Sequence, residues 1–152
     1  KYLLTKVYMP ISLINTEHLD AIYEIDLKTN PSPWSFENLK SSIEVGHQGL
    51  VSIKDTKVIG FAMYSAIPPE CHILNIAIDT KYQGTGEGAL LLKRVIKQSK
   101  AMKIKTIYLE VRISNHKAIN FYESFGFARD AIRDKYYPGN PREDALLMSI
   151  SI

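Results

Sequence analysis

Hydrophobic and polar residues repeat with two periods along the chain, and each period predicts one kind of element. A period of two predicts strands over residues 2–9, 50–54, 58–67, 72–78, 106–111, 128–136 and 145–150. Helical spacing predicts four helices, of which one carries Leu19, Ile22, Tyr23 and Ile25 on its apolar face and three span about 35–43, 86–101 and 115–123. The order β-α-α-β-β-β-α-β-α-β-β predicts a single α/β layered domain over residues 1–152, with helices on both faces of a mixed sheet.

Cap and turn residues separate these elements. Asn15 or Thr16 is suited to cap the first helix and Ser35 the second, whereas Gly126 is placed to end the fourth. The segment NPSPWS, residues 30–35, predicts a loop because its two prolines disfavour helix in the residues before them.

The composition is that of an ordinary globular domain, without a motif for direct nucleic-acid binding. Of 152 residues, 45% are hydrophobic and 23% are charged, and the net charge is only +3. The chain has no apolar run of about 18 residues and its start does not resemble a signal peptide, so no membrane is expected as a partner. The single cysteine, Cys71, excludes an internal disulfide framework and favours a reducing cytoplasm.

Three glycines stand within five residues directly before the third predicted helix, in the sequence YQGTGEGA, residues 82–89. Glycine costs a helix roughly 1 kcal/mol relative to alanine, so these positions predict that a ligand approaches the backbone. Exposed amide N–H groups and the positive end of a helix dipole favour phosphate, although glycines also mark ordinary strand-to-helix turns. A P-loop is excluded because no Gly-Lys-Ser/Thr follows, and a dinucleotide fold because the loop stands past the middle of the chain, after hairpins.

The spacing of Gln83, Gly86 and Gly88 resembles the Q/R-x-x-G-x-G/A loop with which the GNAT superfamily of N-acetyltransferases binds the pyrophosphate of acetyl-coenzyme A (acetyl-CoA). The loop NPSPWS and the segments NIAI, LEVRISNHKAINFYESFGF and YYPGNPREDALLM are similar to successive signatures of its ribosomal-protein-alanine N-acetyltransferase (RimI-like) branch. This resemblance covers nearly the whole chain. It implies the GNAT fold, a mixed, mostly antiparallel sheet of six to seven strands flanked by about four helices, with acetyl-CoA as cosubstrate and no metal.

Acetyl transfer to an amine needs a base for the amine and a proton for the departing thiolate. Glu110 lies on the polar face of its strand, where it is either a base or a salt-bridged sheet residue, and the resemblance implies the general base. Tyr122 either packs in the core or lies near the coenzyme sulfur, and the resemblance implies the general acid. His72 is a candidate second base, because CHILNIAI is also similar to a strand of archaeal and eukaryotic Nα-acetyltransferases that carries a catalytic histidine. Cys71 is interpreted as a plain strand cysteine, since no histidine–acid arrangement clearly accompanies it.

The resemblance also implies which residues contact acetyl-CoA. The pantetheine arm would insert beside a splayed strand, near Asn115 and against the backbone of Ile76, Ala77 and Ile78, where a nearby amide would stabilise the oxyanion. The pyrophosphate would lie on the loop made by Gln83, Gly84, Thr85, Gly86, Glu87, Gly88 and Ala89. Relatives usually carry arginine at one or both positions of Gly84 and Thr85, and an aliphatic residue where Glu87 stands. We therefore expect the loop to bind the pyrophosphate of acetyl-CoA, but with weaker electrostatic attraction than in those relatives.

The substrate implied by the resemblance is the free N-terminus of a protein, with a ribosomal protein or the ribosome as candidate partner. Tyr136 and Tyr137 would form one wall along the peptide and Trp34 the opposite wall, unless the tyrosines only cover a sheet edge. Two other functions stay open: an acetyltransferase of the same fold that acts on a lysine or small amine, and a CoA-binding module without turnover. Lysine's pKa of about 10.4, against about 7.7–8.0 for an α-amine, demands a stronger means of deprotonation. The presence of both Glu110 and Tyr122 argues against a module without turnover.

Overall fold

One seven-stranded sheet forms the centre of the molecule. The computed structural model describes residues 10–46 and 48–152, and the sheet order is β1-β2-β3-β4-β5-β7-β6. Among the described strands, only the β4–β5 pair is parallel, so the sheet is mixed and mostly antiparallel, as predicted. The strands are β1 (Ile11–Leu13), β2 (Gln48–Lys54), β3 (Lys57–Ile67), β4 (Glu70–Ile78), β5 (Thr106–Arg112), β6 (Ala128–Tyr137) and β7 (Glu143–Ser151). The strand predicted over residues 2–9 lies outside the described residues, and the short β1 after it was not predicted.

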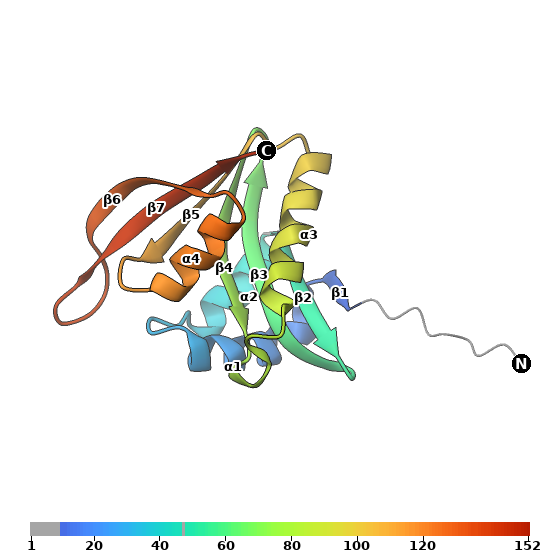
Figure 1. Ribbon diagram of the computed structural model, residues 1–152. Coiled ribbons are helices and arrows are strands. Elements are labelled where there is room, and N and C mark those ends of the chain that lie inside the picture. The colour runs from blue at the N-terminus through green and yellow to red at the C-terminus, as the bar shows by residue number, and fades with distance from the viewer. Residues whose placement is uncertain (1–9, 47) are drawn as a thin grey trace, which may run out of the picture.

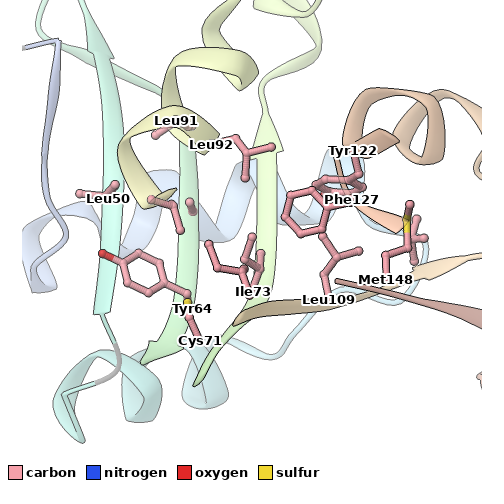
Figure 2. Close-up of a cluster of buried hydrophobic side chains, with 14 of the residues drawn as sticks. Leu50, Tyr64, Cys71, Ile73, Leu91, Leu92, Leu109, Tyr122, Phe127 and Met148 are labelled. Carbon is pink, nitrogen blue, oxygen red and sulfur yellow. The ribbon is translucent and has the colours of Figure 1, made fainter. Parts of the chain in front are cut away.

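Helices cover both faces of this sheet (Figure 1). They are α1 (Leu19–Thr29), α2 (Phe36–Glu44), α3 (Glu87–Ala101) and α4 (His116–Ser124), with 3-10 turns at Thr16–His18 and Thr80–Tyr82. The apolar faces of α1 and α2 pack on one side in a cluster with Val51, Phe61 and Met63. The larger cluster on the other side joins α3 and α4 to the sheet, and Figure 2 shows it extending from Leu50 to Met148.

The helix caps lie at the residues that the sequence predicts. Asn15, rather than Thr16, caps the first helical segment by accepting a hydrogen bond from the Glu17 amide at 2.9 Å. Ser35 and Asn115 accept amide hydrogen bonds in the same way at the starts of α2 and α4, each at 3.1 Å. These bonds satisfy amides that a helix start leaves without an intrahelical partner, so the local sequence determines where these three helical segments begin.

Strands β4 and β5 pair only briefly and then separate. Their parallel pairing runs from Glu70–Thr106 to His72–Tyr108, whereas β4 continues to Ile78 and β5 to Arg112. Beyond His72, β4 stays paired with β3 and β5 stays paired with β7, so each strand follows a different half of the sheet. The result is a split in the sheet that opens beyond His72, between the edges of β4 and β5.

Residues 10–46 and 48–152 contain neither a candidate membrane-spanning helix nor a candidate metal-binding cluster. No helix in this part of the chain has both the length and the apolar character needed to cross a membrane. Nor do three or more His, Cys, Asp or Glu residues there come together in a way that would hold a metal ion.

Candidate active site

Glu110 and His72 meet at the point where β4 and β5 separate. The buried residues of β5, Ile107, Leu109 and Val111, turn the side chain of Glu110 to the opposite face of the sheet. There its Oε1 lies 3.3 Å from Nε2 of His72 and 3.8 Å from Nη1 of Arg133. The Glu110 side chain is 19% exposed and that of His72 is 45% exposed, so both are accessible to a substrate. The salt-bridged interpretation of Glu110 and the catalytic one are therefore both compatible with this geometry.

Tyr122 lies on α4 at the edge of the larger core cluster. Its ring packs against Phe127 with 5.6 Å between centroids, and Figure 2 shows the two rings together near Leu109. Burial raises the pKa of the Tyr122 phenol, and the neighbouring Tyr137 adds to that rise. Tyr122 is thus a core residue whose hydroxyl stays protonated at neutral pH, as a proton donor must.

Tyr137 links the surroundings of Glu110 and Tyr122, which lie on opposite faces of the sheet. Burial raises the pKa of Tyr137 to about 12, and the Glu110 carboxylate is the second cause of the rise. Because Tyr137 in turn raises the pKa of Tyr122, Tyr137 lies within electrostatic reach of both Glu110 and Tyr122. The neighbouring Tyr136 packs edge-on against Tyr137, with 5.0 Å between ring centroids, and is 38% exposed.

A bulge in β6 sets the direction of the Tyr136 and Tyr137 side chains. The register of β6 against β7 passes from Arg133–Ala145 to Tyr137–Glu143, so three residues of β6, 134–136, are opposite one residue of β7, Asp144. Lys135 in the bulge has φ of +49°, and its amide donates to Asp144 at 2.9 Å. Bulges of this kind re-aim side chains, often beside active sites. From the sequence, Tyr136 was expected at the end of a strand with Tyr137 directly after it, and the bulge was not predicted.

The glycine loop takes the form of a helix start with exposed amides. Gly84 and Gly86 have φ of +78° and +86°, and a Cβ at either position would have no atom within 4 Å. They are therefore needed for their left-handed backbone and not for lack of space. Residues 83–86 are exposed, and Gly86 is the N-cap of the fifteen-residue α3, whose positive dipole end is suited to a phosphate. Gln83 braces this loop by donating from Nε2 to the carbonyl of Ile78 at 3.0 Å.

The first residue of α3, Glu87, binds a buried hydroxyl. Ser52 on β2 is fully buried and donates from its Oγ to Oε2 of Glu87 at 3.1 Å. From the sequence, only the repulsion between this carboxylate and a pyrophosphate was expected. The structure adds a second role, because Glu87 satisfies a polar group that would otherwise be buried without a partner.

The remaining predicted residues fall into two groups. Ile76, Ala77 and Ile78 lie on β4 beyond its last pair with β5, where the predicted splay requires them to be. Trp34, in contrast, packs against the core cluster of α1 and α2 and lines a shallow hollow with Asn38. Its place on the opposite wall of the site stays a prediction.

Cys71 takes no part in this site. It is fully buried, and burial raises the pKa of its thiol. A buried, protonated thiol is a poor nucleophile, in agreement with its interpretation as a plain strand cysteine.

Three polar residues of the site were missed in the sequence. Arg112 and Glu143 form an ion pair at 3.1 Å, and Arg112 also donates to Oγ of Ser32 at 2.7 Å. The period of two does place Arg112 on the same strand face as Glu110, which was the available signal. Their meeting with Ser32, eighty residues away in sequence, depends on the fold alone.

Acetyl-CoA fits this combination of features. Its diphosphate needs clustered N–H donors, which the exposed start of α3 offers, and its extended arm needs a strand edge, which the split in the sheet leaves beside β4. The loop and the edge are adjacent because Gln83 bonds directly to the end of β4.

Comparisons with known proteins agree with this fit. The ribosomal protein bS18-alanine N-acetyltransferase of Escherichia coli K12 is 36% identical over 143 residues, which cover 93% of this chain and 97% of that protein. The enzyme of the same name from Haemophilus influenzae is 39% identical over 141 residues, which cover 91% and 96%.

Solved structures show the same likeness. The crystal structure of the Escherichia coli ribosomal-protein-S18-alanine N-acetyltransferase superposes with a TM-score of 0.88, covering 93% of this chain and 92% of the other. A ribosomal-protein-alanine N-acetyltransferase from Brucella melitensis, at 19% identity, shares the fold with a TM-score of 0.79 and coverage of 93% and 98%. The acetyltransferase (GNAT) family matches residues 19–127, so the chain belongs to that family and is an acetyl-CoA-dependent N-acetyltransferase.

Proposed function

We propose that this enzyme acetylates the free α-amino group of a protein, with a ribosomal protein such as bS18 as the substrate. The observation that carries the proposal is the contact of Glu110 with His72, 3.3 Å apart where β4 and β5 separate. The Escherichia coli and Haemophilus influenzae relatives are named for their action on ribosomal protein bS18, which supports the choice of a ribosomal protein. The single buried cysteine suits action in a reducing cytoplasm.

Glu110 is the general base in this proposal. An α-amine with a pKa of about 7.7–8.0 is roughly one-tenth neutral at pH 7, so a carboxylate, directly or through a water, has only a modest task. His72 assists by orienting the carboxylate through its Nε2 and is the second candidate base. A lysine amine, at a pKa of about 10.4, would be neutral in fewer than about one molecule in a thousand, which disfavours the alternative substrate.

Tyr122 is the general acid. Burial keeps its phenol protonated, and its neighbour Tyr137 connects it electrostatically to the surroundings of Glu110. A phenol held at the edge of the core, beside the split, is suited to give its proton to a thiolate that departs there.

Acetyl-CoA supplies an activated acetyl thioester when it is bound. Residues 83–89 would hold its pyrophosphate through the amides at the start of α3, and Asn115 would contact its pantetheine arm. Ile76, Ala77 and Ile78 would present backbone groups to that arm along the β4 edge, where a nearby amide would be placed to stabilise the oxyanion. The peptide lies along Tyr136 and Tyr137, with Trp34 on the other side.

The experiment is acetyl-CoA turnover, followed as free thiol release, on short peptides that begin with different residues. Each peptide also has an N-blocked form with an internal lysine. The expected result is turnover on free N-termini that blocking abolishes and that Glu110→Gln lowers by about 10²- to 10⁴-fold.

Either of two results would contradict the proposal. Turnover that survives blocking of the α-amine would show that the internal lysine is the acceptor. Acetyl-CoA binding without turnover on any peptide would favour a binding module. As a matched control, Glu44→Gln removes an exposed carboxylate on α2, whose only described ion pair is a 4.0 Å contact with Lys40, and should leave turnover unchanged.

A further inference from the structure

Arg112 joins three segments that meet beside Glu110. It lies two residues beyond Glu110 on β5, and its side chain is only 15% exposed. Its guanidinium donates to Oε1 of Glu143 on β7 at 3.1 Å and to Oγ of Ser32, in the loop between α1 and α2, at 2.7 Å. The same group stacks over the ring of Tyr137 on β6, 4.5 Å from its centroid. One side chain therefore contacts both a loop and a hairpin that are far apart in sequence.

The opposite side of that loop is held by a buried carboxylate. Asp26 on α1 is fully buried and accepts hydrogen bonds from the Trp34 amide at 2.8 Å and from Nδ2 of Asn30 at 3.1 Å. It also accepts from Nδ2 of Asn75 on β4, at 2.8 Å. The loop is thus fixed between Asp26, which ties it to β4, and Arg112, which ties it to β5 and the hairpin.

The third contact, on Tyr137, concerns the reaction most directly. Tyr137 follows the β6 bulge, where the regular ladder with β7 is interrupted, so pairing with β7 alone does not fix its ring. Stacking under a planar guanidinium fixes that ring beside Glu110. Glu143 in turn holds the guanidinium and accepts the Ser114 amide at 2.9 Å, which anchors the arrangement to the start of the turn before α4.

We infer that Arg112 is a positioning residue for the amine substrate, holding Tyr137 and the Ser32 loop on either side of the acceptor position. This inference rests on the proposed function only for the identity of that amine. Arginine suits the role because its planar group can donate to two partners and stack on a third, whereas lysine presents a point charge.

The test compares Arg112→Gln and Arg112→Lys with a matched control, Arg129→Gln. Arg129 lies on β6, where its side chain is 55% exposed and pairs with Glu123 of α4 at 2.9 Å. In Arg112→Gln we expect the peptide KM to rise tenfold or more while the acetyl-CoA Kd from calorimetry stays within twofold. Arg112→Lys should be intermediate, and Arg129→Gln should match the wild type. An unchanged peptide KM in Arg112→Gln, or equal changes in peptide KM and acetyl-CoA Kd, would overturn the inference.

A second readout needs no turnover. Trp34 is the only tryptophan of the chain and lies in the loop in question, so its fluorescence reports on that loop alone. Acrylamide should quench Trp34 more strongly in Arg112→Gln and in Ser32→Ala, but not in Arg129→Gln. Equal quenching in all variants would overturn the inference even if the proposed peptide substrate were correct. If the wild type acetylated no peptide N-terminus, the proposed function would fail while the quenching result still decided the role of Arg112.

Discussion

Replacing Gly86 by alanine tests whether the glycine loop is a conformational requirement. Gly86 has φ of +86°, and a Cβ there would have no atom within 4 Å, so the added methyl group meets no clash. The whole effect must come from the left-handed backbone, which costs a residue with a Cβ roughly 1–2 kcal/mol. For a chain of this size, that cost corresponds to a fall in Tm of roughly 2–8 °C.

The same cost can appear in ligand affinity instead. If the loop of Gly86→Ala relaxes to relieve the strain, the left-handed backbone must form again when acetyl-CoA binds the loop amides. Loss of stability and loss of affinity should therefore together amount to about 1–2 kcal/mol, or up to a roughly 30-fold weaker acetyl-CoA Kd if all of it falls on binding. Thermal unfolding and calorimetry on one protein preparation measure both parts.

Gly88→Ala is the matched control, in which we expect Tm to change in the opposite direction. Gly88 lies inside α3, and a Cβ there would make ordinary contacts of 3.7 Å with Ile78 and Phe121. Alanine at such a position stabilises a protein by about 0.4–1 kcal/mol, so Tm should rise by roughly 1–4 °C with acetyl-CoA affinity unchanged. If Gly86→Ala matched the wild type in both Tm and affinity, or if the two variants changed in the same direction, the conformational explanation of the loop would be wrong.

Three further predictions concern single side chains. Glu87→Gln removes the negative charge from the pyrophosphate loop but keeps an acceptor for the Ser52 hydroxyl. Calorimetry should therefore show acetyl-CoA binding about twofold to fivefold more tightly, with Tm unchanged. Equal or weaker binding would reject the electrostatic hypothesis. Tyr122→Phe should lower kcat at least tenfold and leave the acetyl-CoA Kd unchanged, since it removes a proton donor but keeps the ring; wild-type kcat would exclude Tyr122 as the acid. Hydrogen bonds from Ser114, and then from the Arg112 guanidinium, lower the pKa of Glu143 below its ordinary value of 4.5. The contribution of the Glu143 carboxylate to stability is therefore complete above pH 4.5 and is lost as the pH falls through the lowered pKa. Urea unfolding of wild type and Glu143→Gln should show a stability difference at pH 7 that shrinks below about pH 4.5, and a constant difference would contradict this assignment.

The elements and their starting points follow from local sequence. Asn15, Ser35 and Asn115 cap helices because their side chains reach amides only two or three residues away. The period of two on β5 also determines that Glu110 faces away from the core, since a strand side chain can point only to one of two faces. Gly84 and Gly86 mark the loop for the same kind of reason, because only glycine takes positive φ at no cost.

The tertiary structure alone decided the features that make a site from these parts. Whether a strand edge is paired depends on its neighbours, and β4 and β5 separate because β3 and β7 hold them in different halves of the sheet. The direction of Glu87 depends on the buried Ser52, and the role of Arg112 depends on a serine eighty residues earlier. The hydrophobic periodicity of the sequence predicts which face of an element is buried, but not which distant residue contacts that face. The candidate residues could therefore be named from the sequence, whereas the split, the bulge and the contacts of Arg112 required the folded chain.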